Sequence, residues 1–211
     1  LETEIEVSLE DVAKGAERTL EFSRMDLCDT CGGSGARAGT RPERCPSCGG
    51  YGQQEQALGP FLRVVPCARC RGKGTVVSDP CRDCNGSGRQ QKKRTLTVRV
   101  PAGIRDGQAV RLRGEGEPNE AGTGRGDLHV YVRIQPHPML TRRGDDLLCT
   151  VPISFSEAAL GGKVQVPTLN GTEEVEIPAG TQNGDVIRLA RHGLPSLRTA
   201  RPGDQYVQVF V

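Results

Sequence analysis

The sequence C-D-T-C-G-G-S-G at 28–35 is the first of four copies of the motif Cys-x-x-Cys-x-Gly-x-Gly. The others read C-P-S-C-G-G-Y-G at 45–52, C-A-R-C-R-G-K-G at 67–74 and C-R-D-C-N-G-S-G at 81–88, so eight of the nine cysteines lie in these copies. Two thiols separated by two residues on a tight turn can reach one ion, and tetrahedral zinc needs four such ligands. The glycines permit positive φ and bring backbone N–H groups close to the sulfurs. The four copies therefore predict two closed, all-thiolate zinc sites.

The spacing of the copies predicts which of them share an ion. The segment 49–66, which connects Cys48 to Cys67, has the length typical of zinc sites built from two Cys-x-x-Cys pairs, about 15–20 residues. The other two connecting segments, 32–44 and 71–80, are shorter, so the second copy pairs with the third and the first with the fourth. The predicted ligands are Cys28, Cys31, Cys81 and Cys84 for one Zn²⁺ and Cys45, Cys48, Cys67 and Cys70 for the other.

Two other roles for the cysteines fit the sequence less well. Four disulfides would suit a small secreted domain, and a thioredoxin-like redox motif would need a βαβ context that this sequence lacks. Zinc fits the glycines and the four matching copies better. Because zinc-bound thiolates suit a reducing compartment, we expect a cytoplasmic protein.

The composition separates the cysteine-rich stretch from the rest of the chain. The sequence has 211 residues, 35% hydrophobic and 3% aromatic, and 12 of its 28 glycines lie between 28 and 88. That stretch is expected to be held by metal, while the remainder must pack a core. Eight thiolates and two Zn²⁺ ions would change the formal net charge from +2 to −2. This charge gives no indication of a polyanionic partner such as nucleic acid. No apolar run approaches ~18 residues, so we expect no membrane span. The start at Leu1 and the lack of a signal peptide suggest an excised fragment.

An internal repeat defines the rest of the chain. The sequence V-P-A-G at 100–103 recurs as I-P-A-G at 177–180, an offset of 77, and the opening segment recurs at an offset of 146. The difference between the two offsets is extra chain in the first copy, where the second has only the turn 168–172. Alternating apolar residues predict a mostly β fold: two homologous antiparallel β-sandwich domains in tandem, with the two-zinc module inserted in the first. The predicted domains are 1–24 with 92–136, the zinc module 25–91, and 139–211, with a hinge at Pro136-His137-Pro138.

The chain resembles the C-terminal, client-binding portion of DnaJ-type co-chaperones of the zinc-containing class. The resemblance rests on the four cysteine motifs, S-L-E-D-V-A-K-G at 8–15, V-P-A-G-I-R-D-G-Q at 100–108, G-R-G-D-L at 124–128 and R-R-G-D-D-L at 142–147. The sequence has no His-Pro-Asp tripeptide of a J domain, no Gly/Phe-rich linker and no helical dimerisation segment. The resemblance implies a non-enzymatic co-chaperone that binds unfolded polypeptides. In the full-length protein it implies a DnaK-type partner and a homodimer, whereas we expect this fragment to be monomeric.

The resemblance also implies a peptide-binding groove on the first β domain, with an extended client adding to a strand edge. The positions that match this groove could equally be ordinary core residues. They are Leu1, Leu20, Phe22, Leu96 and Val130.

The ninth cysteine, a basic stretch and the cysteine motifs could each indicate a function other than client binding. Cys149 lies in an alternating apolar stretch and is expected to be a core residue. The basic stretch Arg89–Arg94 lacks interleaved aromatic residues, so a solvated strand is favoured over a zinc-ribbon nucleic-acid binder. A thiol–disulfide oxidoreductase would need a labile thiol outside zinc.

Overall fold

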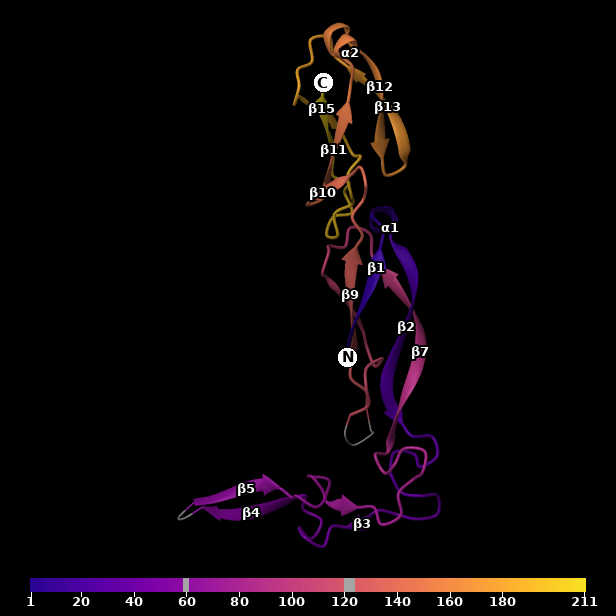
Figure 1. The fold of residues 1–211 in the computed structure, drawn as a ribbon, viewed down its shortest axis with the longest axis vertical. Helices are drawn as coiled ribbons and strands as arrows, with labels where there is room; N and C mark the ends of the chain where they lie inside the picture. The colour runs from indigo at the N-terminus through magenta and orange to yellow at the C-terminus, as the bar shows by residue number, and fades with distance from the viewer. Residues whose placement is uncertain (59–60, 120–123) are drawn as a thin grey trace. The chain divides into compact units, whose positions relative to one another are not determined.

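The computed structural model describes residues 1–58, 61–119 and 124–211, and the chain is mostly β with two short helices (Figure 1). In chain order the elements are β1 (Glu2–Val7), α1 (Leu9–Lys14), β2 (Ala16–Leu27), β3 (Glu43–Arg44), β4 (Gln53–Leu58), β5 (Phe61–Pro66), β6 (Thr75–Val76), β7 (Arg89–Val100), β8 (Ala109–Leu112), β9 (Leu128–Ile134), β10 (Thr141–Arg143), β11 (Asp146–Pro152), α2 (Phe155–Leu160), β12 (Gly162–Thr168), β13 (Gly171–Ile177), β14 (Val186–Leu189) and β15 (Gln205–Phe210).

The chain divides into two compact units. The first contains Leu1, 22–94 and 113–127, and the second contains 2–21, 95–112 and 128–211. All four cysteine motifs therefore belong to the first unit. The second unit holds both helices and the strands β1, β8, β9 and β10 to β15.

The internal repeat is confirmed by the strand registers. In the first β domain the sheet order is β1-β9-β8, and in the second it is β10-β11-β15-β14. Glu2 of β1 pairs with His129 of β9, and Leu148 of β11 pairs with Tyr206 of β15. Leu148 lies 146 residues after Glu2, and Tyr206 lies 77 residues after His129. These are the two offsets that the sequence predicts. A two-stranded sheet accompanies each of the larger sheets, β2-β7 in the first domain and β12-β13 in the second.

The position of the insertion is confirmed as well. β12 and β13 are joined by a tight hairpin in which Thr168 pairs with Gly171. Of their counterparts in the first domain, β2 ends at Leu27 and β7 begins at Arg89. The residues between these two strands contain all four cysteine motifs.

The prediction of purely antiparallel sheets is wrong for one strand pair in each domain. β1 lies parallel to β9, and β11 lies parallel to β15. Alternation of apolar residues shows which face of a strand is buried, but it carries no information about strand direction. Parallel neighbours need a long crossover connection, and both pairs are separated by long stretches of chain.

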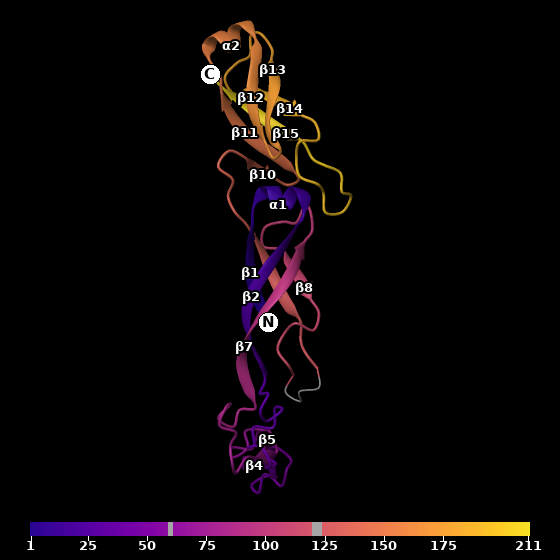
Figure 2. The ribbon, with the colours of Figure 1, turned by 90° about the vertical axis from the view of Figure 1, so that its right-hand side faces the viewer.

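Each helix begins in the same way. The Ser8 side chain accepts a hydrogen bond from the backbone N–H of Asp11, whose carboxylate accepts from the Ser8 N–H. Ser154 and Glu157 form the same capping box at α2. α1 is followed by its C-cap residue Gly15, which has φ of 76°. In both domains the helix lies at one end of the strands that flank it (Figure 1, Figure 2).

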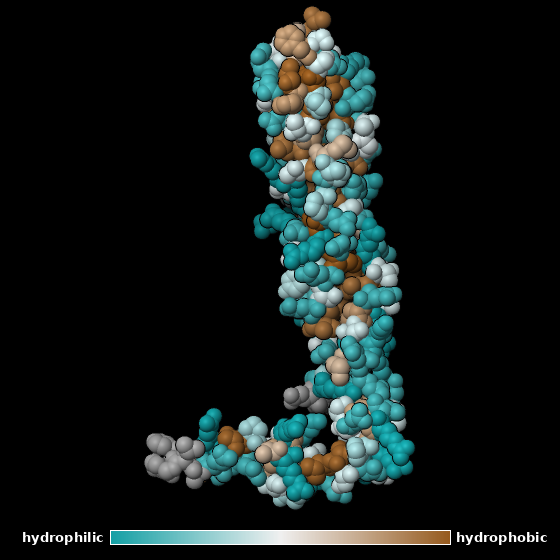
Figure 3. All heavy atoms as spheres, in the orientation of Figure 1, coloured by the Kyte–Doolittle hydropathy of each residue, from teal (hydrophilic) through white to brown (hydrophobic). Residues whose placement is uncertain are grey.

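The core of each β domain is aliphatic. Val98, Val130 and Val132 are fully buried in the first domain, as are Leu147 and Val207 in the second. Cys149 is 3% exposed, which confirms it as a core residue. Apolar atoms reach the surface near α2 (Figure 3), where Phe155 and Leu160 are 80% and 81% exposed.

Among the described residues, neither helix has the length or the apolar character needed to cross a membrane.

Candidate metal centres

The structure gathers the eight motif cysteines into two groups of four. One group is Cys28, Cys31, Cys81 and Cys84, and the other is Cys45, Cys48, Cys67 and Cys70. Within each group all four sulfur atoms lie within 4.8 Å of one another. These are the two sets that the spacing predicts, with the inner pair of motifs nested inside the outer pair.

The distances between the sulfur atoms fit metal coordination. Across the first group they are 4.0 Å from Cys28 to Cys81 and 3.7 Å from Cys31 to Cys84. Across the second they are 3.8 Å and 3.7 Å. A tetrahedron with zinc–sulfur bonds of about 2.3 Å has edges of about 3.8 Å. All nine cysteines are free thiols, since a disulfide would bring two sulfurs to about 2.05 Å.

Backbone N–H groups point at the second cysteine of every motif. The last glycine of each motif donates to that sulfur, over 3.3 Å from Gly35 to Cys31 and 3.2 Å from Gly52 to Cys48. The third and fourth motifs repeat this contact at 3.3 Å each. Such bonds stabilise the negative charge of a thiolate and fix its orientation. The glycines therefore have the role that the sequence predicts for them.

Hydrogen bonds between paired motifs hold each group together. The N–H of Cys28 donates to the carbonyl of Gly88 over 3.0 Å, and that of Cys81 donates to Gly35 over 2.8 Å. In the second group, Cys45 and Cys67 make the same reciprocal contacts with Gly74 and Gly52 at 2.9 and 2.8 Å. Each group is thus built from two motifs related by a local two-fold arrangement.

The thiols of each group differ in acidity. Burial raises the pKa of these thiols, but backbone N–H groups outweigh burial at Cys31 and Cys45 and lower the pKa of each to about 7. At Cys70 and Cys81, burial and the neighbouring thiols raise the pKa to about 11. At neutral pH the Cys70 and Cys81 thiols therefore stay protonated, and a bound cation would favour their ionisation.

The donor set and the burial of the sulfurs fit zinc. All four cysteines of the second group are buried, and in the first group only Cys31 is half-buried. Four thiolates complete a tetrahedral shell and leave no position for substrate, as in structural zinc sites. When bound, zinc would supply folding energy to this module.

The five residues predicted for the client groove have different exposures. Val130 is fully buried and Leu20 is 7% exposed, whereas Phe22 and Leu96 are half-buried and Leu1 is 39% exposed. Leu1 and Phe22 belong to the first unit and the others to the second. The assembly of these residues into one groove stays a prediction.

A buried charge cluster in the first unit was not predicted from the sequence. Asp26 and Arg24 are 3% and 6% exposed, and the Asp26 carboxylate accepts hydrogen bonds from Arg125 at 2.6 Å and Arg94 at 3.2 Å. Burial alone would raise the pKa of Asp26, but the hydrogen bonds from Arg125 and Arg94 lower it below its usual value. Charged residues at alternating, inward-facing positions of β2 were the signal that could have revealed this cluster.

Comparison with known proteins agrees with the geometry. The family model described as DnaJ C terminal domain matches residues 1–211. "Chaperone protein DnaJ" of Nitrosomonas europaea is 44% identical over 207 residues, which cover 98% of this chain and 56% of that protein. The proteins of the same name from Acetivibrio thermocellus and Methylorubrum extorquens are 44% and 46% identical, over 100% and 98% of this chain and 56% and 54% of their own lengths. The chain thus spans about half the length of these curated relatives. Because the match runs from the first residue to the last, the chain belongs to the DnaJ C-terminal domain family.

Proposed function

We propose that this chain binds non-native polypeptides and is the client-binding part of a co-chaperone. The relatives that match it across nearly its whole length are named chaperone proteins. In the longer protein, bound clients would be handed to a DnaK-type chaperone. This role requires no catalytic residue, because a site that binds clients needs only affinity for the exposed apolar segments of a non-native polypeptide.

The observation that carries this proposal is the open edge of β1. Among the described strands, β1 pairs only with β9 and stands at the end of its sheet. Its other edge presents backbone N–H and C=O groups to which an extended peptide could add as a further strand. Backbone hydrogen bonds carry no side-chain information, so such a site would accept many client sequences.

Apolar side chains would give the site its affinity for clients. Leu96 on β7 is half-buried, two residues before the fully buried Val98 on the same face. Burying one client Leu or Phe side chain would contribute about 1.5–3 kcal/mol. With a few strand hydrogen bonds, we expect peptide affinity around the micromolar range or weaker.

The cysteine groups would have a structural role in this function. We propose that each holds one Zn²⁺ and that residues 25–91 form a zinc module inserted in the β domain made of 1–24 and 92–136. Residues 139–211 would form the second β domain. The longer protein would be a homodimer in the cytoplasm, whereas this fragment would be monomeric.

The test is a titration with an apolar heptapeptide, comparing Leu96→Ser with two controls. Val98→Ala changes a fully buried core residue of the same strand. Val164→Ser changes a half-buried residue of β12 in the second β domain. We expect Leu96→Ser to weaken peptide binding about 10-fold and to have little effect on the melting temperature. Val98→Ala should lower the melting temperature instead.

The outcome that contradicts the proposal is peptide binding by Leu96→Ser that equals the parent chain. Equal weakening by Leu96→Ser and Val164→Ser would place a second site on the repeated domain and would contradict a groove confined to the first.

A further inference from the structure

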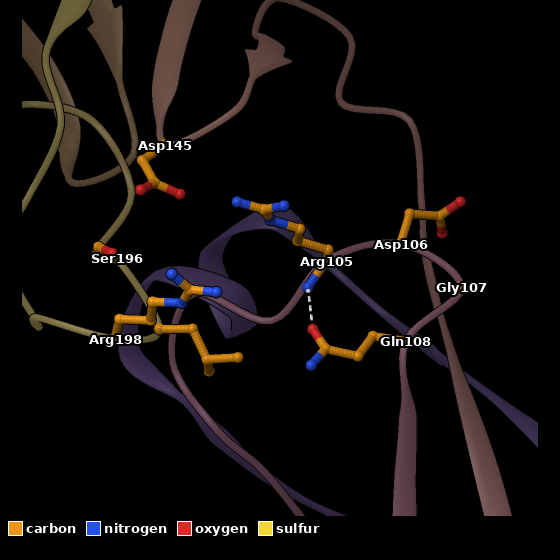
Figure 4. A pocket seen from close by; sticks show the side chains of 8 residues that line it. Arg105, Asp106, Gly107, Gln108, Asp145, Ser196 and Arg198 are labelled. Atoms are coloured by element: carbon orange, nitrogen blue, oxygen red, sulfur yellow. Dashed lines mark hydrogen bonds between the residues drawn. The ribbon is translucent and has the colours of Figure 1, made fainter.

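A cavity of about 560 Å³ lies in the second unit, between the turn that precedes β8 and the loop that precedes β15 (Figure 4). Its size is within the range of small-molecule sites. The first β domain and the second each contribute four residues. The lining residues are Arg105, Asp106, Gly107 and Gln108, and Asp145, Ser196, Leu197 and Arg198.

The first wall of this cavity is fixed by hydrogen bonds. The Gln108 side chain accepts from the backbone N–H of Arg105 over 3.2 Å, as Figure 4 shows. The N–H of Gly107 donates to Val132 of β9 over 2.8 Å. The Asp106 carboxylate is also engaged, because it accepts from the N–H of Ile134 over 2.8 Å.

The second wall is fixed equally well. The Leu194 N–H donates to the Asp145 carbonyl over 2.7 Å, and the Ser196 N–H donates to Arg201 over 2.9 Å. This wall packs directly on Gly103, since a Cβ added there would lie 2.1 Å from the carbonyl oxygen of Pro195. Both backbones are therefore held in place without any contribution from the side chains of Arg105, Asp145 and Arg198.

Three charged groups of the cavity form no hydrogen bond or ion pair with the described residues. They are the guanidinium of Arg105, that of Arg198 and the carboxylate of Asp145. Figure 4 shows the Arg105 guanidinium and the Asp145 carboxylate pointing toward one another, with the Arg198 guanidinium beside the same space. Nearby Arg142 is different, because it donates to the carbonyls of Gly103 and Ile104. Its positive charge also lies close enough to the Asp145 carboxylate for the two to attract each other.

The internal repeat does not require these side chains. At the offset of 77, Arg105 and Gln108 of the first domain correspond to Gln182 and Asp185 of the second. The backbone turn is nevertheless repeated, since Gly184 donates to Val209 over 2.8 Å as Gly107 does to Val132. A positive charge at 105 is therefore not needed to form the turn, and the exposed Arg105 side chain is free to contact a ligand in the cavity.

We propose that this cavity binds a partly protonated phosphate, with inorganic phosphate as the best ligand. Two guanidinium groups can donate charge-assisted hydrogen bonds to phosphate oxygens, and the Ser196 hydroxyl can add a third. The Asp145 carboxylate beside them can only accept hydrogen bonds. A ligand that contacts it must therefore also carry a hydrogen-bond donor. Hydrogen phosphate has a P–OH group, whereas sulfate has none at neutral pH.

The need for a P–OH donor also predicts that free phosphate binds more tightly than esterified phosphate. With a second pKa near ~6, a phosphate monoester is mostly a dianion at pH 7.5 and has lost its last P–OH. Inorganic phosphate keeps one P–OH at that pH. We therefore expect inorganic phosphate to bind more tightly than methyl phosphate, a monoester with no other donor, and more tightly than sulfate.

The test is a titration of the zinc-loaded chain with phosphate, methyl phosphate and sulfate at constant ionic strength and pH 7.5, followed by amide NMR. Phosphate should shift the amides of 105–108 and 196–198 with a dissociation constant of about a millimolar or tighter. Arg105→Gln, which introduces the residue of the repeat, and Arg198→Gln should each weaken binding about 10-fold. Asp145→Asn should remove the preference for phosphate over sulfate.

The control is Lys93→Gln, which removes the same charge from an exposed residue of β7 outside the cavity and should leave binding unchanged. Equal binding of phosphate and sulfate by the parent chain, or equal binding by Arg105→Gln and Lys93→Gln, would overturn the proposal. So would the absence of shifts at 105–108, 145 and 196–198, or a dissociation constant above about 10 mM. Methyl phosphate binding more tightly than phosphate would overturn the role of Asp145.

Discussion

Gly52 lies against the carbonyl oxygen of Gly72, so closely that a Cβ on Gly52 would stand 2.3 Å from that atom. The contact joins the second cysteine motif to the third. Gly74 makes the matching contact with Gly50 at 2.4 Å, and the outer motifs repeat both contacts at 2.3 and 2.5 Å. The last glycine of every motif is therefore required for close packing of the paired motifs as well as for its positive φ.

Replacing Gly52 with alanine should release metal from the inner cysteine group alone. The added methyl group meets backbone, which cannot rotate away, and it would separate Cys45 and Cys48 from Cys67 and Cys70. Metal analysis after dialysis should find about one Zn²⁺ per chain instead of two.

Gly72→Ala is the matched control for this change. Gly72 has φ of 90°, but a Cβ there meets nothing within 4 Å. That variant should carry only the backbone strain, about 1–2 kcal/mol, and keep both ions. Equal metal loss from the two variants would contradict a steric role for Gly52.

Chelation of zinc should unfold the cysteine module and leave the β domains folded. Each cysteine group is a cluster of buried sulfurs with little apolar packing around it, whereas the β domains have aliphatic cores. Amide hydrogen exchange with EDTA should show protection lost in 28–88 and kept in β9 and β15. Loss of protection in β9 would show that the insertion is needed to fold the domain that carries it.

Asp26→Asn should destabilise the chain at neutral pH by about 1.5–3 kcal/mol, because Arg94 and Arg125 lose a charged, buried acceptor. Arg24 keeps its ion pair with Glu115, so its charge stays compensated in the variant. The pKa of Asp26 is lowered in the folded state, so the stability it contributes is fully present above the unfolded pKa of about 3.9. It is lost as the pH falls through the lower, folded value.

Urea unfolding of both chains at several pH values checks this expectation. The difference between parent and variant should be constant from pH 7 to about 5 and should shrink below about pH 3.9. A difference that is independent of pH down to about 2 would show that the Asp26 charge does not stabilise the fold.

Gln205→Leu should raise the melting temperature. Gln205 is fully buried and its Oε1 accepts no hydrogen bond from the described residues, while the corresponding residue of the first domain, Leu128, is a fully buried core residue. Removing an unsatisfied polar atom should stabilise the fold by about 1 kcal/mol, although the bonds from Nε2 to the Pro167 carbonyl and the Cys149 sulfur are lost. A lower melting temperature would show that these bonds outweigh the unsatisfied oxygen.

The sequence predicts local chemistry and repeats here better than it predicts strand direction or buried charge. The grouping of Cys48 with Cys67 follows from spacing because the ligands of one ion must be close in space, and the repeat follows from the offsets. The parallel pairing of β1 with β9 does not follow from the sequence, since apolar and polar residues alternate in the same way in parallel and antiparallel strands. Buried Asp26 was missed because its partners Arg94 and Arg125 are 68 and 99 residues away in the chain.

The nested grouping of the cysteines has a consequence for the order in which the module assembles. The inner group closes the loop 49–66, whereas the outer group formed first would close the much longer loop 32–80. Once the inner group is in place, the outer one has only the flanking segments 32–44 and 71–80 left to order. This shortens the loop by roughly a factor of two, which favours the outer group by about 0.6 kcal/mol of loop-closure entropy. The inner ion should therefore enter first and act as a template for the outer one. During synthesis the third motif leaves the ribosome before the fourth, so the direction of translation and the entropy of the chain favour the same order.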